Sequence, residues 1–284
     1  MNISFQQWAT GSGVIRHDET TQQRIADLLI DLERQGLCSQ EQALRLFAAT
    51  DYLCNMAMWL TVHMTYAKHV YLDGRELQAS DFKKIPEGHT GGALNIVPAY
   101  VGYLLANALT GKTRAWLMGQ GHCVAAIDAV NILLGNTEPE QAARYPLSDA
   151  GLSQLAQDFY SYQIGADGHP AVPLGSHVNP YTAGGIIEGG YLGFAELQYV
   201  HMPLPKQELV AFLSDGAFEE QRGSDWVPRF WRGEDTGLVM PIMIANGRRI
   251  DQRTTMSQSG GVYWFKEHLK LNGFDPIEIN GRDP

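Results

Sequence analysis

The stretch Leu209-Val-Ala-Phe-Leu-Ser-Asp-Gly-Ala217 contains the pattern that decides the fold of this chain. An unbroken apolar run predicts a buried strand, and the Asp-Gly pair after it predicts a turn into the next segment. A second apolar run, Leu238 to Ala245, ends in a similar way at Asn246-Gly-Arg248. Buried strands that each end in an oxygen-bearing side chain indicate a parallel α/β sheet with a divalent-cation site at its carboxyl edge. The N–H groups of the turn after Asp215 suit a diphosphate.

Composition and charge exclude several classes of protein. The chain has 284 residues, 44% of them hydrophobic and 18% charged, as expected for a globular protein of one large domain or two small ones. A formal net charge of −10 and the lack of a Lys/Arg cluster argue against nucleic-acid binding. The three cysteines lack metal spacing and indicate a reduced, cytoplasmic compartment. No signal-peptide pattern opens the sequence, and polar residues interrupt its most apolar segment, Leu53 to Val70, so we expect no membrane span.

The order of helical and strand patterns predicts a helical arm followed by an α/β domain. Residues 1–18 are polar and expected to be loosely held. Helical spacing predicts a helix over 20–34 and a second from Ser39, capped with the help of Gln42, toward Tyr71. These helices make up an arm over residues 1–75, and residues 76–284 predict a doubly wound, mostly parallel sheet with helices on both faces. Further elements expected in that domain are helices over 93–109, 122–134, 190–199 and 262–271, strands over 114–118 and 276–279, and a long irregular loop over 164–185.

Histidines beside glycines form a further set of candidate site residues. His89 and His122 each follow a glycine at a predicted helix start, and His177 lies in the long loop. A glycine allows a ligand to come close to the backbone, and an imidazole can donate a hydrogen bond to an anion. Each pair taken alone is more often a cap or a surface feature, and Asp-Gly and Asn-Gly after a strand are common turns. Their order, and their joint placement at strand ends, favour a site.

These motifs resemble the diphosphate-binding half of phosphoketolases, which belong to the thiamine diphosphate-dependent transketolase superfamily. The resemblance runs from about Leu44 to the C-terminus. It rests on GHTGGALN (88–95), GQGHCV (119–124), GSHVNPYTAGGIIEGGYLGF (175–194), SDGAFEE (214–220) and IANGRRI (244–250). The third motif matches phosphoketolases better than transketolase proper, whereas the Asp-Gly…Asn signature is shared by the superfamily and specifies only the cofactor.

The resemblance implies roles for individual residues. Asp215, the side chain of Asn246 and the backbone carbonyl of Arg248 would bind Mg²⁺ or Ca²⁺. His89, His122 and His177 would be catalytic and handle protons of a ketose-type substrate. Residues implied in binding thiamine diphosphate are Gly121, His122, Gly190, Leu192, Gly216, Ala217, Glu219 and Asn246. The cofactor supplies the carbanion chemistry in such enzymes, and the protein supplies orientation and acid–base groups.

Departures from the family pattern define the alternatives. Ser214 replaces a glycine, Ile187 replaces a histidine, and Ala217 replaces an acidic residue for which Glu219 is the nearest match. Family enzymes are well over twice as long, and their second half carries the pyrimidine-binding domain. We therefore expect this chain to be one subunit of a split enzyme whose partner chain supplies the pyrimidine domain. The enzyme would cleave a ketose or α-hydroxyketone and transfer a two-carbon unit. We expect its assembly to be a homodimer or heterotetramer. The alternatives are a fragment of a longer phosphoketolase and a non-catalytic scaffold or regulatory homologue.

Overall fold

The computed structural model describes residues 3–11, 14–118, 123–161, 163–168, 171–172, 208–220, 238–249, 252–271 and 273–283. The chain forms two compact units. Unit 1 comprises Met1–Lys112, Cys123–His177 and Asn280–Pro284. Unit 2 comprises Thr113–His122 and Val178–Ile279. The boundary between an arm over 1–75 and a domain over 76–284 stays a prediction.

Unit 1 opens with three helices, each capped by a polar side chain. They are α1 (Phe5–Ala9), α2 (Glu19–Arg34) and α3 (Gln40–Tyr66). Ser39 forms the predicted capping box with Gln42, so the helices expected over 20–34 and from Ser39 are confirmed. The second ends at Tyr66 rather than near Tyr71, because Ala67 is extended and forms an isolated β-bridge with Phe82.

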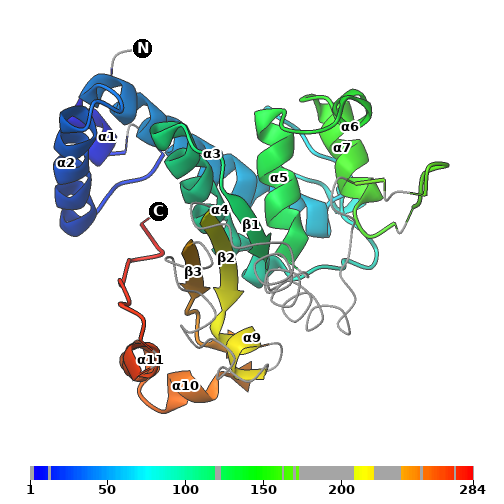
Figure 1. Cartoon of the computed structure of the whole chain (residues 1–284). Helices are drawn as coiled ribbons and strands as arrows, with labels where there is room; N and C mark the ends of the chain where they lie inside the picture. The colour runs from blue at the N-terminus through cyan, green and yellow to red at the C-terminus, as the bar shows by residue number, and fades with distance from the viewer. Residues whose placement is uncertain are drawn as a thin grey trace. The chain divides into compact units, whose positions relative to one another are not determined.

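For the described residues 3–11 and 14–18, the prediction of a loosely held segment is wrong. Trp8 is 2% exposed, its ring stacks on His17 with centroids 4.1 Å apart, and it lies 6.3 Å from the ring of Phe47. These contacts place α1 in an apolar cluster with α2 and the first turns of α3 (Figure 1). One buried tryptophan supplies enough apolar area to order a segment whose composition is otherwise polar.

The rest of α3 packs against α4 (Thr90–Thr110) and α5 (Val124–Leu134), which also pack against each other. Fully buried side chains of these three helices include Leu60, Met64, Ile96, Val97 and Ile127. Within the described part of the chain, α4 is the one helix whose length and composition would let it cross a membrane. It packs against two neighbouring helices. The helices expected over 93–109 and 122–134 are thus confirmed within a few residues.

Two further helices of unit 1 are absent from the sequence-based expectation. They are α6 (Pro139–Arg144) and α7 (Asp149–Asp158), and α7 packs against α3. A short 3-10 helix, η1 (Ala79–Asp81), precedes α4.

The last residues of the chain return to unit 1. Asp283 Oδ1 lies 2.5 Å from His17 Nδ1, and Asp283 Oδ2 accepts a hydrogen bond from the N–H of Asp18 at 2.6 Å. The other ring nitrogen of His17 lies 3.1 Å from Asp51 Oδ2. The buried imidazole of His17 therefore lies between two carboxylates that come from distant parts of the sequence.

Unit 2 contains, among its described residues, a parallel sheet in the order β1-β2-β3 (Figure 1). The strands are β1 (Ala115–Met118), β2 (Glu208–Ser214) and β3 (Leu238–Ile244). Val210 to Leu213 are at most 2% exposed, as expected for a parallel strand that is buried on both sides. The predicted α/β class, with a parallel sheet and N-terminal helices, is confirmed.

Short elements complete unit 2. They are α9 (Asp215–Glu220), the antiparallel pair β4 (Arg248–Arg249) and β5 (Gln252–Arg253), α10 (Thr255–Gln258) and α11 (Gly261–Leu271). The last of these confirms the helix over 262–271. The closing strand over 276–279 is wrong: this segment pairs with no described strand, and Ile277 and Ile279 are 84% and 69% exposed. The helix over 190–199 and most of the loop over 164–185 lie outside the described residues.

Candidate functional site

Two neighbouring strands of unit 2 end at the residues expected to hold a cation. In the β2–β3 register Ser214 pairs with Ile244, so Asp215 follows one strand end directly and Asn246 follows the other two residues later. Carboxyl ends of parallel strands lie at the same edge of a sheet. The two strand ends are in direct contact here, because Asp215 Oδ2 accepts a 2.7 Å hydrogen bond from the N–H of Gly247, the residue after Asn246.

The Asp215 carboxylate is buried and surrounded by neutral donors. It is 4% exposed. Oδ1 accepts from the N–H of Gly216 at 3.0 Å, and Oδ2 accepts from Gly247 and from the Thr254 hydroxyl at 3.3 Å. Burial raises the pKa of Asp215, and these hydrogen bonds offset part of that rise. A buried carboxylate held by neutral donors favours binding of a cation, which would compensate its charge.

The turn after β3 brings the other two expected ligands beside Asp215. Asn246 is exposed, and its Oδ1 accepts from the N–H of Arg248 at 2.9 Å, which makes a tight Asx turn. Gly247 within that turn has a φ of +72°, a conformation that favours glycine. The Arg248 carbonyl oxygen faces Gly216, since a Cβ built on Gly216 would lie 2.9 Å from it.

The donor set at these strand ends fits a small hard cation. It consists of a carboxylate, an amide oxygen and a backbone carbonyl, the oxygen ligands that Mg²⁺ and Ca²⁺ prefer. It contains a single carboxylate, and the described residues contain no group of three or more His, Cys, Asp or Glu side chains that could hold a metal. The residues are therefore suited to a metal that a diphosphate would also coordinate.

Glu219 is engaged in holding two short helices together. Its Oε1 accepts from the N–H of Met256 at 2.9 Å, and its Oε2 lies 3.6 Å from a guanidinium nitrogen of Arg249. These contacts join α9 to α10 and to β4. The role of Glu219 in cofactor binding stays a prediction.

His89 lies in unit 1, at the N-cap of α4. A Cβ built on Gly92 would lie 2.6 Å from His89 Nδ1 and 2.7 Å from Cys123 Sγ, so Gly92 leaves the space that the imidazole and the thiol occupy. Burial lowers the pKa of His89 and favours the neutral imidazole. The preceding Gly88 has a φ of +140° and lies against the side chains of Thr65 and Tyr160.

Several predicted site residues lie outside the described part of the chain: Gly121, His122, His177, Gly190 and Leu192. Ala217 lies in α9, and Ile187 is also outside the described residues. The convergence of the predicted histidines on one site therefore stays a prediction. Conversely, the structure adds Thr254 and Ser257, which the sequence-based expectation lacks; Thr254 begins a Thr-x-x-Ser pattern that caps α10.

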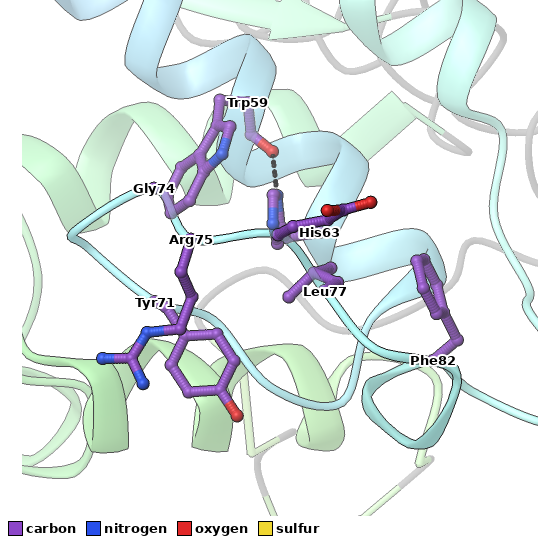
Figure 2. A pocket seen from close by; sticks show the side chains of 8 residues that line it. Trp59, His63, Tyr71, Gly74, Arg75, Leu77 and Phe82 are labelled. Carbon is purple, nitrogen blue, oxygen red and sulfur yellow. Dashed lines mark hydrogen bonds between the residues drawn. The ribbon is translucent and has the colours of Figure 1, made fainter.

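A cavity of about 350 Å³ lies within unit 1, beside α3 (Figure 2). Its wall includes Trp59, His63, Tyr71, Arg75, Leu77 and Phe82. The Arg75 guanidinium lies over the Tyr71 ring, 4.5 Å from its centroid (Figure 2). It is also paired with Asp73 at 2.8 Å. None of the predicted site residues that the structure describes lines this cavity.

Comparison with known proteins supports the resemblance seen in the motifs. Probable phosphoketolase 2 of Lactiplantibacillus plantarum is 28% identical over 234 residues, which cover 80% of this chain and 28% of that protein. The xylulose-5-phosphate phosphoketolase of Lactiplantibacillus pentosus is 27% identical over the same shares of both chains. A probable phosphoketolase of Synechococcus elongatus is 27% identical over 84% of this chain and 29% of that protein. The chain thus spans less than a third of the length of these relatives.

A family model described as the XFP N-terminal domain matches residues 44–284, which is most of the chain. The match begins where the motif resemblance begins, and it includes most of α3 and every element of both units that follows it. The chain therefore belongs to the XFP N-terminal domain family, the N-terminal part of phosphoketolase-type proteins.

Proposed function

We propose that this chain is the diphosphate-binding subunit of a thiamine diphosphate-dependent, transketolase- or phosphoketolase-like enzyme of the cytoplasm. The proposed reaction cleaves a ketose or related α-hydroxyketone and transfers a two-carbon unit. One observation carries the proposal: a buried Asp215 carboxylate lies beside the turn that holds Asn246 and Arg248, at the ends of two neighbouring parallel strands. The family membership agrees with it.

The chain's own residues have distinct tasks in this proposal. Asp215, Asn246 and the Arg248 carbonyl would hold Mg²⁺ or Ca²⁺, and Gly216 leaves the space that the Arg248 carbonyl occupies. His89, kept neutral near pH 7 by burial, can accept a proton from a sugar hydroxyl. When bound, thiamine diphosphate supplies the carbanion chemistry.

A partner chain completes the proposed enzyme. The resemblance assigns the pyrimidine domain, and the glutamate that activates the cofactor, to the second half of family enzymes. Relatives are more than three times as long as the segment this chain matches. The proposed assembly is a homodimer or heterotetramer in which a pyrimidine-domain partner supplies that half. A fragment of a longer phosphoketolase would show the same coverage, and an open reading frame that continues into a pyrimidine domain would identify it.

A non-catalytic homologue is the second candidate. Ile187 and Ser214 favour it, since the family pattern has a histidine and a glycine at those positions. The two candidates differ in cofactor binding, because a scaffold has no need of an intact cation site.

The test is calorimetric titration of thiamine diphosphate with Mg²⁺ into the chain co-expressed with its pyrimidine-domain partner. We expect saturable binding that Asp215→Ala abolishes. Asp215→Asn is the second variant, because its amide oxygen can still accept from Gly247 and Thr254 while the charge is lost. Asp275→Ala, an exposed acidic position in unit 2, is the matched control and should bind as the wild type does.

Two outcomes would overturn the proposal. Equal affinity in the wild type and Asp215→Asn would remove the cation assignment. A folded complex that binds no thiamine diphosphate with Mg²⁺ would favour the non-catalytic homologue.

A further inference from the structure

Thr254 lies at the centre of a hydrogen-bond network beside Asp215. It is 0% exposed and is the N-cap of α10. Its N–H donates to the carbonyl of Gly247 at 3.1 Å, and its own carbonyl accepts from the Ser257 hydroxyl at 2.9 Å. The Gly247 carbonyl oxygen, 3.3 Å from the Ser257 hydroxyl, is the alternative acceptor for its single proton. This network joins the turn after β3 to the start of α10.

The position of the Thr254 hydroxyl proton follows from its partners. A hydroxyl has one proton to donate and two lone pairs to accept with. The N–H of Ser257 donates to the Thr254 hydroxyl at 3.3 Å, so that contact uses a lone pair. The ionised Asp215 carboxylate can only accept, so the hydroxyl proton goes to Asp215 Oδ2, 3.3 Å away.

The two carboxylate oxygens of Asp215 therefore differ in how many further hydrogen bonds or metal contacts each can accept. Oδ2 accepts from both Gly247 and Thr254, which fills its two lone pairs. Among the residues that the structure describes, Oδ1 accepts from the N–H of the adjacent Gly216 alone, so one of its lone pairs is available to another partner. Holding Oδ2 at two points also fixes the rotation of the carboxylate, so the available lone pair has one direction.

We propose that Thr254 is a positioning residue that fixes the Asp215 carboxylate so that Oδ1 faces the cation. The inference rests on the proposed function and extends it to a residue outside the expected ligand set. Partners that hold a metal ligand in place change metal affinity by about 10- to 100-fold when they are removed. Because Thr254 also caps α10, its positioning role must be separated from its contribution to the fold.

The experiment measures free Mn²⁺ by electron paramagnetic resonance while the complex of this chain with its pyrimidine-domain partner is titrated with Mn²⁺ in the presence of thiamine diphosphate. Thr254→Val removes the hydroxyl and keeps the shape, and we expect Mn²⁺ affinity to fall by about tenfold or more. Thr254→Ser keeps the hydroxyl and should restore affinity to near that of the wild type. Ser257→Ala is the matched control, since it removes a hydroxyl from the same network that does not touch Asp215.

The outcomes separate the positioning role from a structural one. Wild-type affinity in Thr254→Val would overturn the inference, and so would an equal loss in Ser257→Ala. If thermal melting shows that Thr254→Val is unfolded, Thr254→Cys replaces it: the thiol is a weak donor, so its affinity should fall between those of the valine and serine variants.

The Asp215→Asn variant separates a failure of the proposed cation site from a failure of the positioning role of Thr254. If wild type binds Mn²⁺ and Asp215→Asn does not, the cation site stands and Thr254→Val alone decides the positioning role. If the folded wild type and Asp215→Asn bind Mn²⁺ equally poorly, the cation site of the proposed function fails, and the role of Thr254 fails with it.

Discussion

Gly216 allows a sharp test of the geometry at the strand ends. A Cβ at this position would lie 2.9 Å from the Arg248 carbonyl oxygen and 3.2 Å from Arg249 Cβ. The nearest atom belongs to the backbone and cannot rotate away. Gly216→Ala must therefore displace the turn that carries the carbonyl expected to bind the cation.

The expected magnitude combines two opposing effects. Alanine in place of glycine in a helix stabilises by roughly 1 kcal/mol, whereas forcing an extra carbon into a packed site costs about 1–3 kcal/mol. Gly216→Ala should thus lower the free energy of unfolding by roughly 0–2 kcal/mol. Gly102 is the matched control, because it lies exposed in α4 and a Cβ added there would meet no atom within 4 Å. Gly102→Ala should stabilise by about 0.5–1 kcal/mol.

Urea unfolding followed by circular dichroism measures both variants. The Gly216 variant should be less stable than the Gly102 variant by about 0.5–3 kcal/mol, and its melting temperature should be lower than that of the Gly102 variant. Equal stabilisation by both substitutions would refute the close approach of the Arg248 carbonyl to Gly216, and with it the shared site of Asp215, Asn246 and Arg248.

Three further predictions concern unit 1. Asp283→Ala removes a partner of the buried His17, and the free energy of unfolding should fall by about 2 kcal/mol in a urea titration; an unchanged midpoint would contradict the contact. Burial lowers the pKa of Lys83 to about 8 in the folded protein, whereas an ordinary lysine has a pKa of about 10.4. Between these two pH values the unfolded chain binds more protons than the folded protein does. The free energy of unfolding should therefore rise with pH across this window. Lys83→Met should lose this pH dependence in denaturant titrations, and an identical slope would exclude Lys83 as its source. A thiol reagent should label the half-buried Cys38 first, because the other two thiols are buried with pKa values raised to about 12; rapid labelling that survives in Cys38→Ser would contradict this.

Local sequence signals predict the regular elements well where the signal is long or chemically specific. The strand before Asp215 is a continuous apolar run, and only a strand buried on both sides suits such a run in a short segment. Ser39 with Gln42 marks the start of α3 to the residue.

Short elements escape prediction because their signals are local and weak. α6 and α7 begin at residues typical of helix starts, Pro139 and the N-cap Ser148, but each helix is too short for a clear helical period. Conversely, the alternation of Ile277 and Ile279 suggests a strand, yet β-pairing depends on a neighbour that the sequence does not specify.

The residues of the candidate site likewise differ in whether the sequence alone can identify them. Asp215 and Asn246 are predictable because each closes an apolar run. Thr254 is not, since it lies 39 residues after Asp215 and meets it only through the tertiary fold. The link between Glu219 and Met256, 37 residues apart, is hidden from the sequence for the same reason.

The two units exchange segments of chain, and this has a consequence for how the protein could be divided. β1 belongs to unit 2 although it comes from the N-terminal part of the chain, and Asn280–Pro284 belongs to unit 1 although it comes from the C-terminal end. A break between His177 and Val178 would leave each product with a piece of the other's unit. The N-terminal product would keep its strand beside β2, and the C-terminal product would keep Asp283 on His17. Two separately synthesised polypeptides divided at this point are therefore complementary halves, suited to reconstitution by simple mixing.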